Sequence, residues 1–532
     1  MSGVAAGTRP LPARAGGLRR STVAILLALA VFGLYGVSTG NLVGYEDETA
    51  AVSEGLVKAG ELRVLDGTPL TAQGISGREG HRYSRTGLTQ PVLEAPFYWI
   101  GEQLDHIASN GKSYRWRLDA LRLYNPAMAT LTVLAIFGLL LLRGVSDRRA
   151  LGVAALCAVA TLIWPYSKIG MDTTLMAMLA LALLAGAWTA ARPTAARFAL
   201  AGIGAGLTVN TKPYGALLLV GVVPLLVGPF KALLALPRKR SIRALVAFAL
   251  PVICALAAIG WYDWYRTGSV TDFVDTYVSR LLATPIGAIG LFLSPGKGLV
   301  LYSPLVFLGL LSLRTLWRAD RALALSVGLT VAVNTLFIAT SLVWADETWG
   351  PRYLIPSAWM LVLPLAWWAR GRRRLGVVGA LATVGVCVQL AGVLANYGVT
   401  VPAASALAGE PAYQFAHAAY GDDGPRWVPQ ASPLLFGLEL VAAYVKEHLT
   451  GSGFVVSYQP FRGRQATIDL RAPEKSFGPL PDFWWTFPGR SEKEELLALL
   501  LGALALGAGG LLVAARGWGL RHLLAGGHEA NC

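Results

Sequence analysis

Runs of about twenty apolar residues recur along the chain, and each is long enough to cross the ~30 Å hydrocarbon core of a bilayer as a helix. The chain has 532 residues, of which 54% are hydrophobic and only 14% are charged. These runs predict an all-α polytopic membrane protein.

Windows of this length predict about twelve transmembrane helices, with both termini in the cytoplasm. They lie near residues 21–41, 122–142, 150–164, 172–190, 198–209, 214–230, 244–262, 298–313, 322–343, 354–369, 375–395 and 495–515. The first run follows a basic segment, as in a signal peptide, but no convincing small-residue cleavage site follows it. We therefore expect an uncleaved first helix.

The formal charge of +15 comes largely from short loops between the apolar runs, such as LLRGVSDRRA, KALLALPRKRSIR and ARGRRR. Such loops mark the cytoplasmic side of a membrane protein. The charge therefore sets orientation in the inner (plasma) membrane, and we expect no nucleic-acid partner.

This orientation divides the chain. We expect a cytoplasmic N-terminus (1–20), a transmembrane domain (21–395) with external loops at 42–121 and 263–297, an external subdomain (396–494), a last transmembrane helix (495–515) and a cytoplasmic tail (516–532).

The predicted external subdomain contains the alternating stretches GFVVSYQPF and RQATIDLRA, which favour a few short strands. Between the membrane helices and these strands, residues 433–449 carry charged residues within an apolar pattern. This pattern predicts an amphipathic helix on the membrane surface rather than a span.

Several familiar sites are not supported. Three of the four cysteines lie inside apolar runs, so neither disulfides nor a zinc site is expected. The GIGAG motif (202–206) lies within an apolar helix, where small residues favour tight helix packing over dinucleotide binding. The SPGKG motif (294–298) lacks the spacing of a Walker A loop.

Three consecutive acids, Glu46, Asp47 and Glu48, follow the first apolar run. Acids at the start of a helix interact favourably with its dipole and can cap it, which is the ordinary explanation. Carboxylates close to a membrane helix are also energetically costly, so they are usually retained because they have a function.

The Asp47–Glu48 pair after the first span resembles the motif of the membrane-embedded C-type (GT-C) glycosyltransferases, which include protein O-mannosyltransferases and lipid A aminoarabinose transferases. Further stretches are similar in the same order, over about 400 residues: GHRYSRTGLTQPVLEAPFYWIG, IWPYSKIGMDTTLMAMLAL, AGIGAGLTVNTKPYG, GLFLSPGKGLVLYSP and WGPRYLIP. One departure is Ala50, where the aminoarabinose transferases have arginine.

The resemblance implies a GT-C fold and transfer of a sugar, with inversion, from a polyprenyl phosphate to an acceptor hydroxyl on a cell-envelope glycan, lipid or protein. The reaction would take place on the external face of the membrane. A hydroxyl needs a base as it attacks, and the resemblance assigns this role to Asp47, with Glu48 beside it. No cofactor is certain, although Glu46, Asp47 and Glu48 could hold a divalent cation, as acids of this loop do in some relatives.

The leaving phosphate gains charge, which fixed cations would stabilise. The external candidates are Arg85, Lys297 and Arg352. Lys297 lies in a turn that could direct N–H groups at an anion or could simply precede a helix at headgroup level. Arg352 could instead pair with Asp346 or Glu347, and Arg78 and Arg82 compete with Arg85.

His81 and Tyr83 are candidates for contact with the acceptor or the sugar. The tryptophans of residues 482–489 could stack on a glycan, but interfacial aromatic belts explain them equally well. Lys168 and Lys212 lie at predicted helix ends, where we expect them to reach the headgroups.

A second class of function is a transporter or flippase of a lipid-linked saccharide. It would place charged residues and broken helices near the bilayer midplane. The acids identified here lie at helix ends instead, which favours the enzyme.

Overall fold

The computed structural model of the chain describes most of its length. The described residues are 19–40, 45–70, 74–111, 113–191, 193–234, 237–271, 287–341, 344, 346, 348–396, 400–401, 403–404, 432–451, 454–458, 466–470, 480–486 and 492–525.

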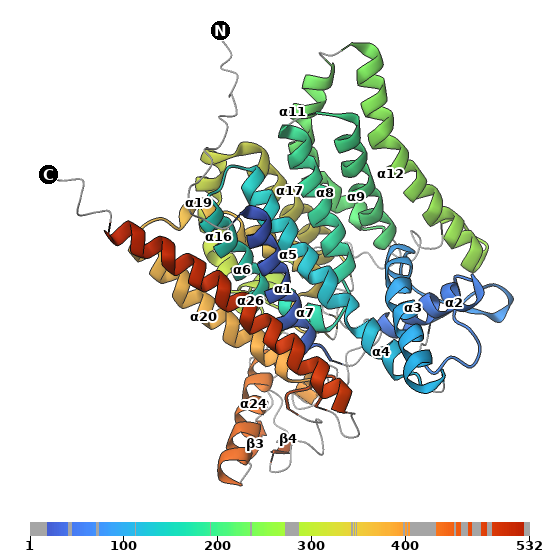
Figure 1. Ribbon diagram of the computed structural model, residues 1–532, viewed down its shortest axis with the longest axis vertical. Coiled ribbons are helices and arrows are strands. Elements are labelled where there is room, and N and C mark those ends of the chain that lie inside the picture. The colour runs from blue at the N-terminus through green and yellow to red at the C-terminus, as the bar shows by residue number, and fades with distance from the viewer. Residues whose placement is uncertain are drawn as a thin grey trace.

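Within these residues the chain forms a helical bundle, as predicted (Figure 1). Seven helices are long and apolar enough to cross a membrane, which supports a multi-pass membrane protein. They are α1 (Arg20–Ser38), α4 and α5 together (Arg115–Leu142), α8 (Thr173–Ala191), α12 (Arg238–Thr267), α17 (Arg321–Ala339), α20 (Arg372–Leu394) and the first part of α26 (Glu492–Ala525).

The remaining predicted spans are shorter or broken, so twelve crossings stay a prediction. They correspond to α6 (Asp147–Val159) with α7 (Ile163–Lys168), α9 (Ala195–Thr211), α10 (Gly215–Leu218) with η2 (Leu219–Gly221) and α11 (Val223–Leu234), α15 (Leu299–Tyr302) with α16 (Leu305–Ala319), and α18 (Ile355–Val362) with α19 (Leu365–Trp368). The pair α10–η2 and α11 is bent by 62°. Pro304 and Pro364 stand at two breaks, where proline cannot continue the preceding hydrogen bonds.

Ion pairs place several arginine-rich loops at one end of the bundle. Arg20, at the start of α1, lies 3.1 Å from Asp147 at the start of α6. Arg143 pairs with Asp320, which joins the loop after α5 to the loop before α17. That these loops share one end of the bundle agrees with the predicted alternation of arginine-rich and arginine-poor loops between the two membrane faces. The assignment of that end to the cytoplasm rests on the positive-inside rule.

Close packing through small residues explains GIGAG. A Cβ on Gly202 would lie 2.2 Å from the Phe248 carbonyl oxygen, and one on Gly206 would lie 2.9 Å from that of Pro251, both on α12. The prediction of helix packing is therefore confirmed. Gly33 of α1 makes a similar approach to Leu501 of α26.

Replacing Gly202 with valine should separate α9 from α12, because the new side chain meets backbone that cannot rotate away. Overpacking of this kind costs about 1–3 kcal/mol. We expect a lower midpoint of thermal unfolding than for Gly376→Val, since Gly376 on α20 has open space around it. Equal midpoints for the two variants would contradict close packing at Gly202.

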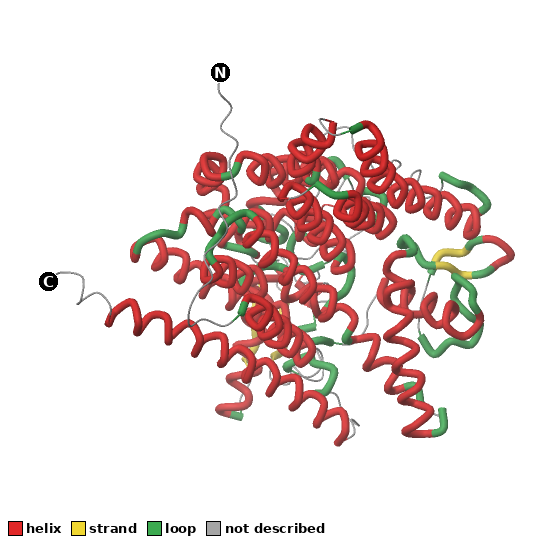
Figure 2. The backbone as a smooth tube through the Cα atoms, turned by 45° about the horizontal axis from the view of Figure 1, so that its top comes forward, coloured by secondary structure: helices red, strands yellow, loops and turns green. Residues whose placement is uncertain are grey.

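The segment predicted as the first external loop is a small folded unit. It contains α2 (Tyr45–Ala59), a hairpin of β1 (Ile75–Ser76) and β2 (Arg82–Tyr83) with η1 (Arg78–Gly80) between them, α3 (Thr89–Ser109) and α4 (Arg115–Arg122). Ala51, Val52 and Tyr98 form its core. Figure 2 shows the hairpin beside these helices, at the edge of the bundle.

Part of the predicted outer subdomain is described. Its helix is α24 (Pro433–Thr450), and the two predicted strands form an antiparallel hairpin of β3 (Phe454–Tyr458) and β4 (Ala466–Leu470). The presence of the helix and of the strands is therefore confirmed, whereas the position of the helix on the membrane surface and the outer subdomain stay predictions. Most of residues 396–494 lie outside the described residues. Helix α26 also continues through Ala525, past the predicted end of the last span at 515.

Candidate functional site

Helix α2 begins with the three acids, and the structure gives them different environments. Glu46 and Glu48 are buried, whereas Asp47 between them is half-buried. Successive residues of a helix point about 100° apart, so consecutive acids separate around the axis. Asp47 is thus the acid of the three with the largest access to a substrate.

Glu46 ties α2 to the bundle. Its Oε1 accepts a hydrogen bond from the Asn125 Nδ2 of α5 at 2.5 Å and another from the backbone N–H of Gly170. A Cβ at residue 170 would lie 2.0 Å from the Asn125 amide. Glycine therefore allows the segment 169–172 to approach Asn125 of α5, and Glu46 of α2 accepts hydrogen bonds from both.

Glu48 holds Arg85. The Arg85 Nε lies 3.1 Å from Glu48 Oε1, and the Arg85 backbone N–H donates to Oε2 at 3.3 Å. Burial raises the pKa of Glu48, and the charge of Arg85 lowers it in part. The Arg85 side chain is 42% exposed, so the predicted phosphate ligand is held by the residue that follows the predicted base and can reach solvent.

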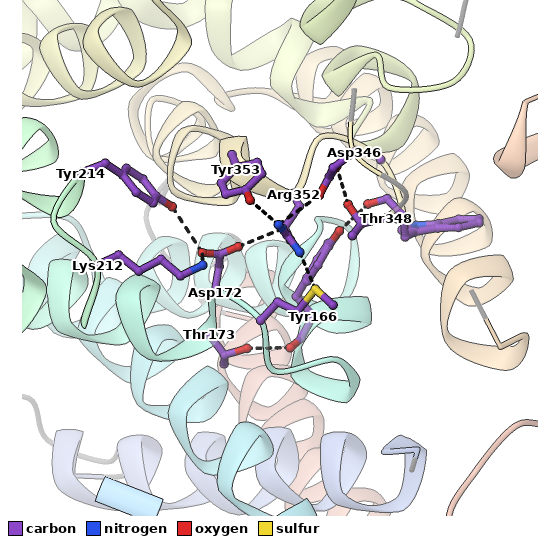
Figure 3. A network of polar contacts seen from close by, with 12 residues as sticks. Tyr166, Asp172, Thr173, Lys212, Tyr214, Asp346, Thr348, Arg352 and Tyr353 are labelled. Atoms are coloured by element: carbon purple, nitrogen blue, oxygen red, sulfur yellow. Dashed lines mark hydrogen bonds and ion pairs between the residues drawn. The ribbon is translucent and has the colours of Figure 1, made fainter. Parts of the chain in front are cut away.

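A second polar group lies at the same end of the bundle, on the short connection before α8 (Figure 3). Asp172 Oδ1 accepts hydrogen bonds from the Lys212 Nζ at 2.5 Å and from the Tyr214 hydroxyl at 3.3 Å. Its Oδ2 lies 3.3 Å from the Arg352 Nε. All these charged side chains are buried.

The group extends from Arg352, at the start of η4 (Arg352–Leu354), to Asp346. Arg352 Nη2 lies 3.1 Å from Asp346 Oδ2, which confirms the alternative pairing considered for this arginine. Burial would raise the pKa of Asp346, but the charges of Lys297 and Arg352 outweigh it and hold this pKa below its ordinary value.

Lys297 is also a member of this group. Its ammonium donates to Asp346 Oδ1 at 2.8 Å and to the carbonyl oxygens of Thr348 and Gly350 at 2.7 and 2.9 Å. Its side chain is 1% exposed. These contacts exclude the alternative that Lys297 sits at headgroup level, and they favour a structural role over the direct phosphate contact that the sequence suggested.

The two polar groups are joined through three consecutive residues. Gly170 donates to Glu46, the sulfur of Met171 contacts Arg352, and Asp172 pairs with Arg352. Counted over the described residues alone, the second group contains three cations and two carboxylates, a net charge of +1. This excess favours an anion at the same end of the bundle.

Sequence reasoning missed Asp172 and misjudged two lysines. Lys212 and Lys168 were expected at the headgroups, but this expectation is wrong, since both are about 95% buried in ion pairs. The available signal was Asp172 itself, a lone acid at the start of an apolar run, where an unpaired charge would be costly.

Lys168 anchors the segment before α26. Its Nζ lies 2.8 Å from Asp482 Oδ2 and donates to the Val393 carbonyl at the end of α20. The indole N–H groups of Trp484 and Trp485 donate to the last carbonyls of α1. Trp484 is 2% exposed and is therefore no platform for a glycan.

His81 and Tyr83 lie on the hairpin unit. The Tyr83 ring is buried and packs edge-on against Tyr265, with 5.7 Å between the ring centroids. This burial corrects its expected role in contacting the acceptor or sugar. His81 is half-buried, with Nδ1 2.8 Å from the Arg63 Nη1.

Among the described residues, no group of three or more His, Cys, Asp or Glu side chains has the arrangement of a metal site. Glu46 and Glu48 instead accept hydrogen bonds from the protein. The proposed divalent cation at these acids has no structural support in the described part of the chain.

Glu94 of α3 is a buried acid beside α2. It accepts hydrogen bonds from the Gln90 Nε2 at 2.8 Å, the Thr49 hydroxyl at 3.2 Å and the Ser53 hydroxyl at 3.4 Å. All three donors are neutral. Burial raises the pKa of Glu94 to about 8, so the carboxyl is protonated at neutral pH.

Replacing Lys297 with methionine should destabilise the protein strongly, because it leaves Asp346 buried with one cation removed. Breaking a buried ion pair costs about 3–5 kcal/mol. Arg85→Met should be milder than Lys297→Met, since the guanidinium end of its pair with Glu48 is 42% exposed to solvent, although Glu48 is buried. Thermal unfolding in detergent measures both, and a mild Lys297→Met would contradict the structural role.

The stability contributed by Glu94 should depend on pH. Its pKa is raised in the folded protein, so its contribution is complete below about 4.5 and is lost as the pH rises through about 8. Glu94→Gln mimics the protonated form. Between pH 6 and pH 9 the wild type should therefore lose more thermal stability than this variant; equal losses would contradict a buried neutral carboxyl, and Glu102→Gln is the control.

Comparison with known proteins does not extend this account. A search against protein-family models found no matching family, and a search of curated proteins found no significant match.

Proposed function

We propose that this protein is a glycosyltransferase of the GT-C type, which moves a sugar from a polyprenyl-phosphate donor to a cell-envelope hydroxyl. The observation that carries the proposal is that Asp47 is a half-buried carboxylate of α2 and that the next residue, the buried Glu48, pairs with the partly exposed guanidinium of Arg85. The motif resemblance concerns the same residues.

Asp47 and Arg85 match the two changes of charge in the proposed reaction, namely the proton lost by the acceptor hydroxyl and the negative charge gained by the leaving phosphate. An acceptor hydroxyl attacks the anomeric carbon and transfers its proton to a carboxylate, for which Asp47 is the proposed base. The bond from that carbon to the donor phosphate breaks, and the phosphate leaves with an added negative charge. Arg85 is the proposed cation that stabilises this charge.

The buried residues have supporting roles in this proposal. Glu46 holds the start of α2 against the segment 169–172, and Glu48 orients Arg85. The group around Asp172 and Arg352 contributes an excess positive charge at the same end of the bundle. Its cations are already paired with carboxylates, so the proposal gives them no direct contact with the donor.

One observation favours the transporter or flippase instead, namely the 62° bend between α10–η2 and α11. The charged groups nevertheless gather where α2, α8 and η4 begin, and not along the middle of the spans. This placement supports chemistry at one membrane face over passage through the bundle.

Asp47→Asn tests the proposal, because it keeps the size of the side chain and removes the base. In nanodiscs supplied with polyprenyl-phosphate sugars and envelope acceptors, transfer should fall by at least about a hundredfold. Asp66→Asn is the matched control, since Asp66 is an exposed acid of the same external unit. Full activity of a folded Asp47→Asn would reassign the base, and no transfer by the wild type with valid substrates would favour the transporter.

A further inference from the structure

Helix α3 carries an apolar stripe that the described protein leaves uncovered. Five large apolar side chains on it are between 39% and 82% exposed: Val92, Trp99, Ile100, Leu104 and Ile107. At 100° per residue they cover an arc of roughly 140° on one side of the helix. The opposite side is buried against α2 and α4 and includes Glu94, Tyr98 and Asp105.

Both ends of α3 are attached to the ends of bundle helices. At its start, the Thr89 hydroxyl lies 3.2 Å from the Leu207 carbonyl and 3.3 Å from Asn210 Oδ1, in the last turns of α9. The preceding Gly87 N–H donates to the Thr211 carbonyl. Helix α9 packs between the candidate spans α8 and α12.

At the other end, Asp105 accepts hydrogen bonds from the backbone N–H groups of Trp116 and Arg117 at 3.0 and 3.3 Å. These residues open the helix that continues through α4 into α5, itself a candidate span. Gly101 brings the two backbones together, since a Cβ there would lie 2.5 Å from the Arg117 Cα.

A helix attached in this way runs along the end of the bundle and does not cross it. It has 21 residues, or about 32 Å at 1.5 Å per residue. The attachments tie it to the helix α5, a candidate span, and to α9, which packs between the candidate spans α8 and α12. An exposed tryptophan on such a stripe is also typical of the membrane interface.

We propose that α3 lies in the interface of the external leaflet, with its apolar stripe inserted among the lipids. Its polar side then holds α2, because Glu94 bonds Thr49 and the Ser53 hydroxyl donates to the Pro91 carbonyl at 2.8 Å. The insertion fixes the height of α2 at the headgroup region. The consequence of this height for Asp47 as a base rests on the proposed function. The insertion of α3 among the lipids does not depend on that function.

Spin labels measure this insertion without any activity assay. In a variant with all four cysteines replaced, a single cysteine carries the label at residue 107, in nanodiscs of phosphatidylglycerol and phosphatidylethanolamine. Labels at Val384, exposed on the span α20, and at Asp66, on the external unit, serve as lipid and water controls. Collisions with oxygen and with a water-soluble nickel complex are then compared.

At residue 107 we expect an oxygen-to-nickel collision ratio several-fold above that at residue 66 and close to that at residue 384. A ratio like that at residue 66 would overturn the proposal. Low collision rates with both reagents would overturn it in favour of a protein covering the stripe. A second label at residue 99, on the same stripe, should repeat the result if α3 is folded as described.

Discussion

Buried charge is the main constraint on the end of the bundle that carries Glu46, Asp172 and Arg352. An ionised side chain removed from water is costly unless an opposite charge and hydrogen bonds compensate it. Lys168, Lys212 and Lys297 are each buried with a carboxylate partner. Their partners lie on different elements of the chain, so the pairs fix how the loops between the helices sit relative to one another.

These buried contacts explain how Asp47 and Arg85 can stay accessible to solvent. The start of α2 is held by Glu46 through Asn125 and Gly170, and by Glu94 through Thr49 and Ser53. With the helix held on two sides, Asp47 and Arg85 can remain near the surface without disturbing the packing. In the proposed reaction, a base and a cation that are already held in place would need little reorganisation when substrate binds.

The sequence predicted the helical class, the positions of the apolar helices, the α24 helix and the β3–β4 strands, because these follow from hydrophobic periodicity. It did not predict the partners of Lys168 and Lys212, since ion pairs between distant segments leave no local pattern. Asp172 was overlooked although it carried a local signal, a lone acid at the start of an apolar run. A helix starting at the three acids was considered from the sequence and is present as α2, whereas α3 and α4 were missed, because amphipathic helices are not apparent in windows that detect spans.

In the proposed mechanism, Asp47 and Arg85 form one site with a lipid-linked donor. The most direct measurement is a cryo-EM structure in lipid nanodiscs with a non-hydrolysable polyprenyl-phosphonate sugar. The account predicts the phosphonate beside the Arg85 guanidinium and the anomeric carbon facing Asp47, with the lipid tail in the membrane. A sugar bound midway along the spans, or at the end marked by Arg20 and Asp320, would contradict it.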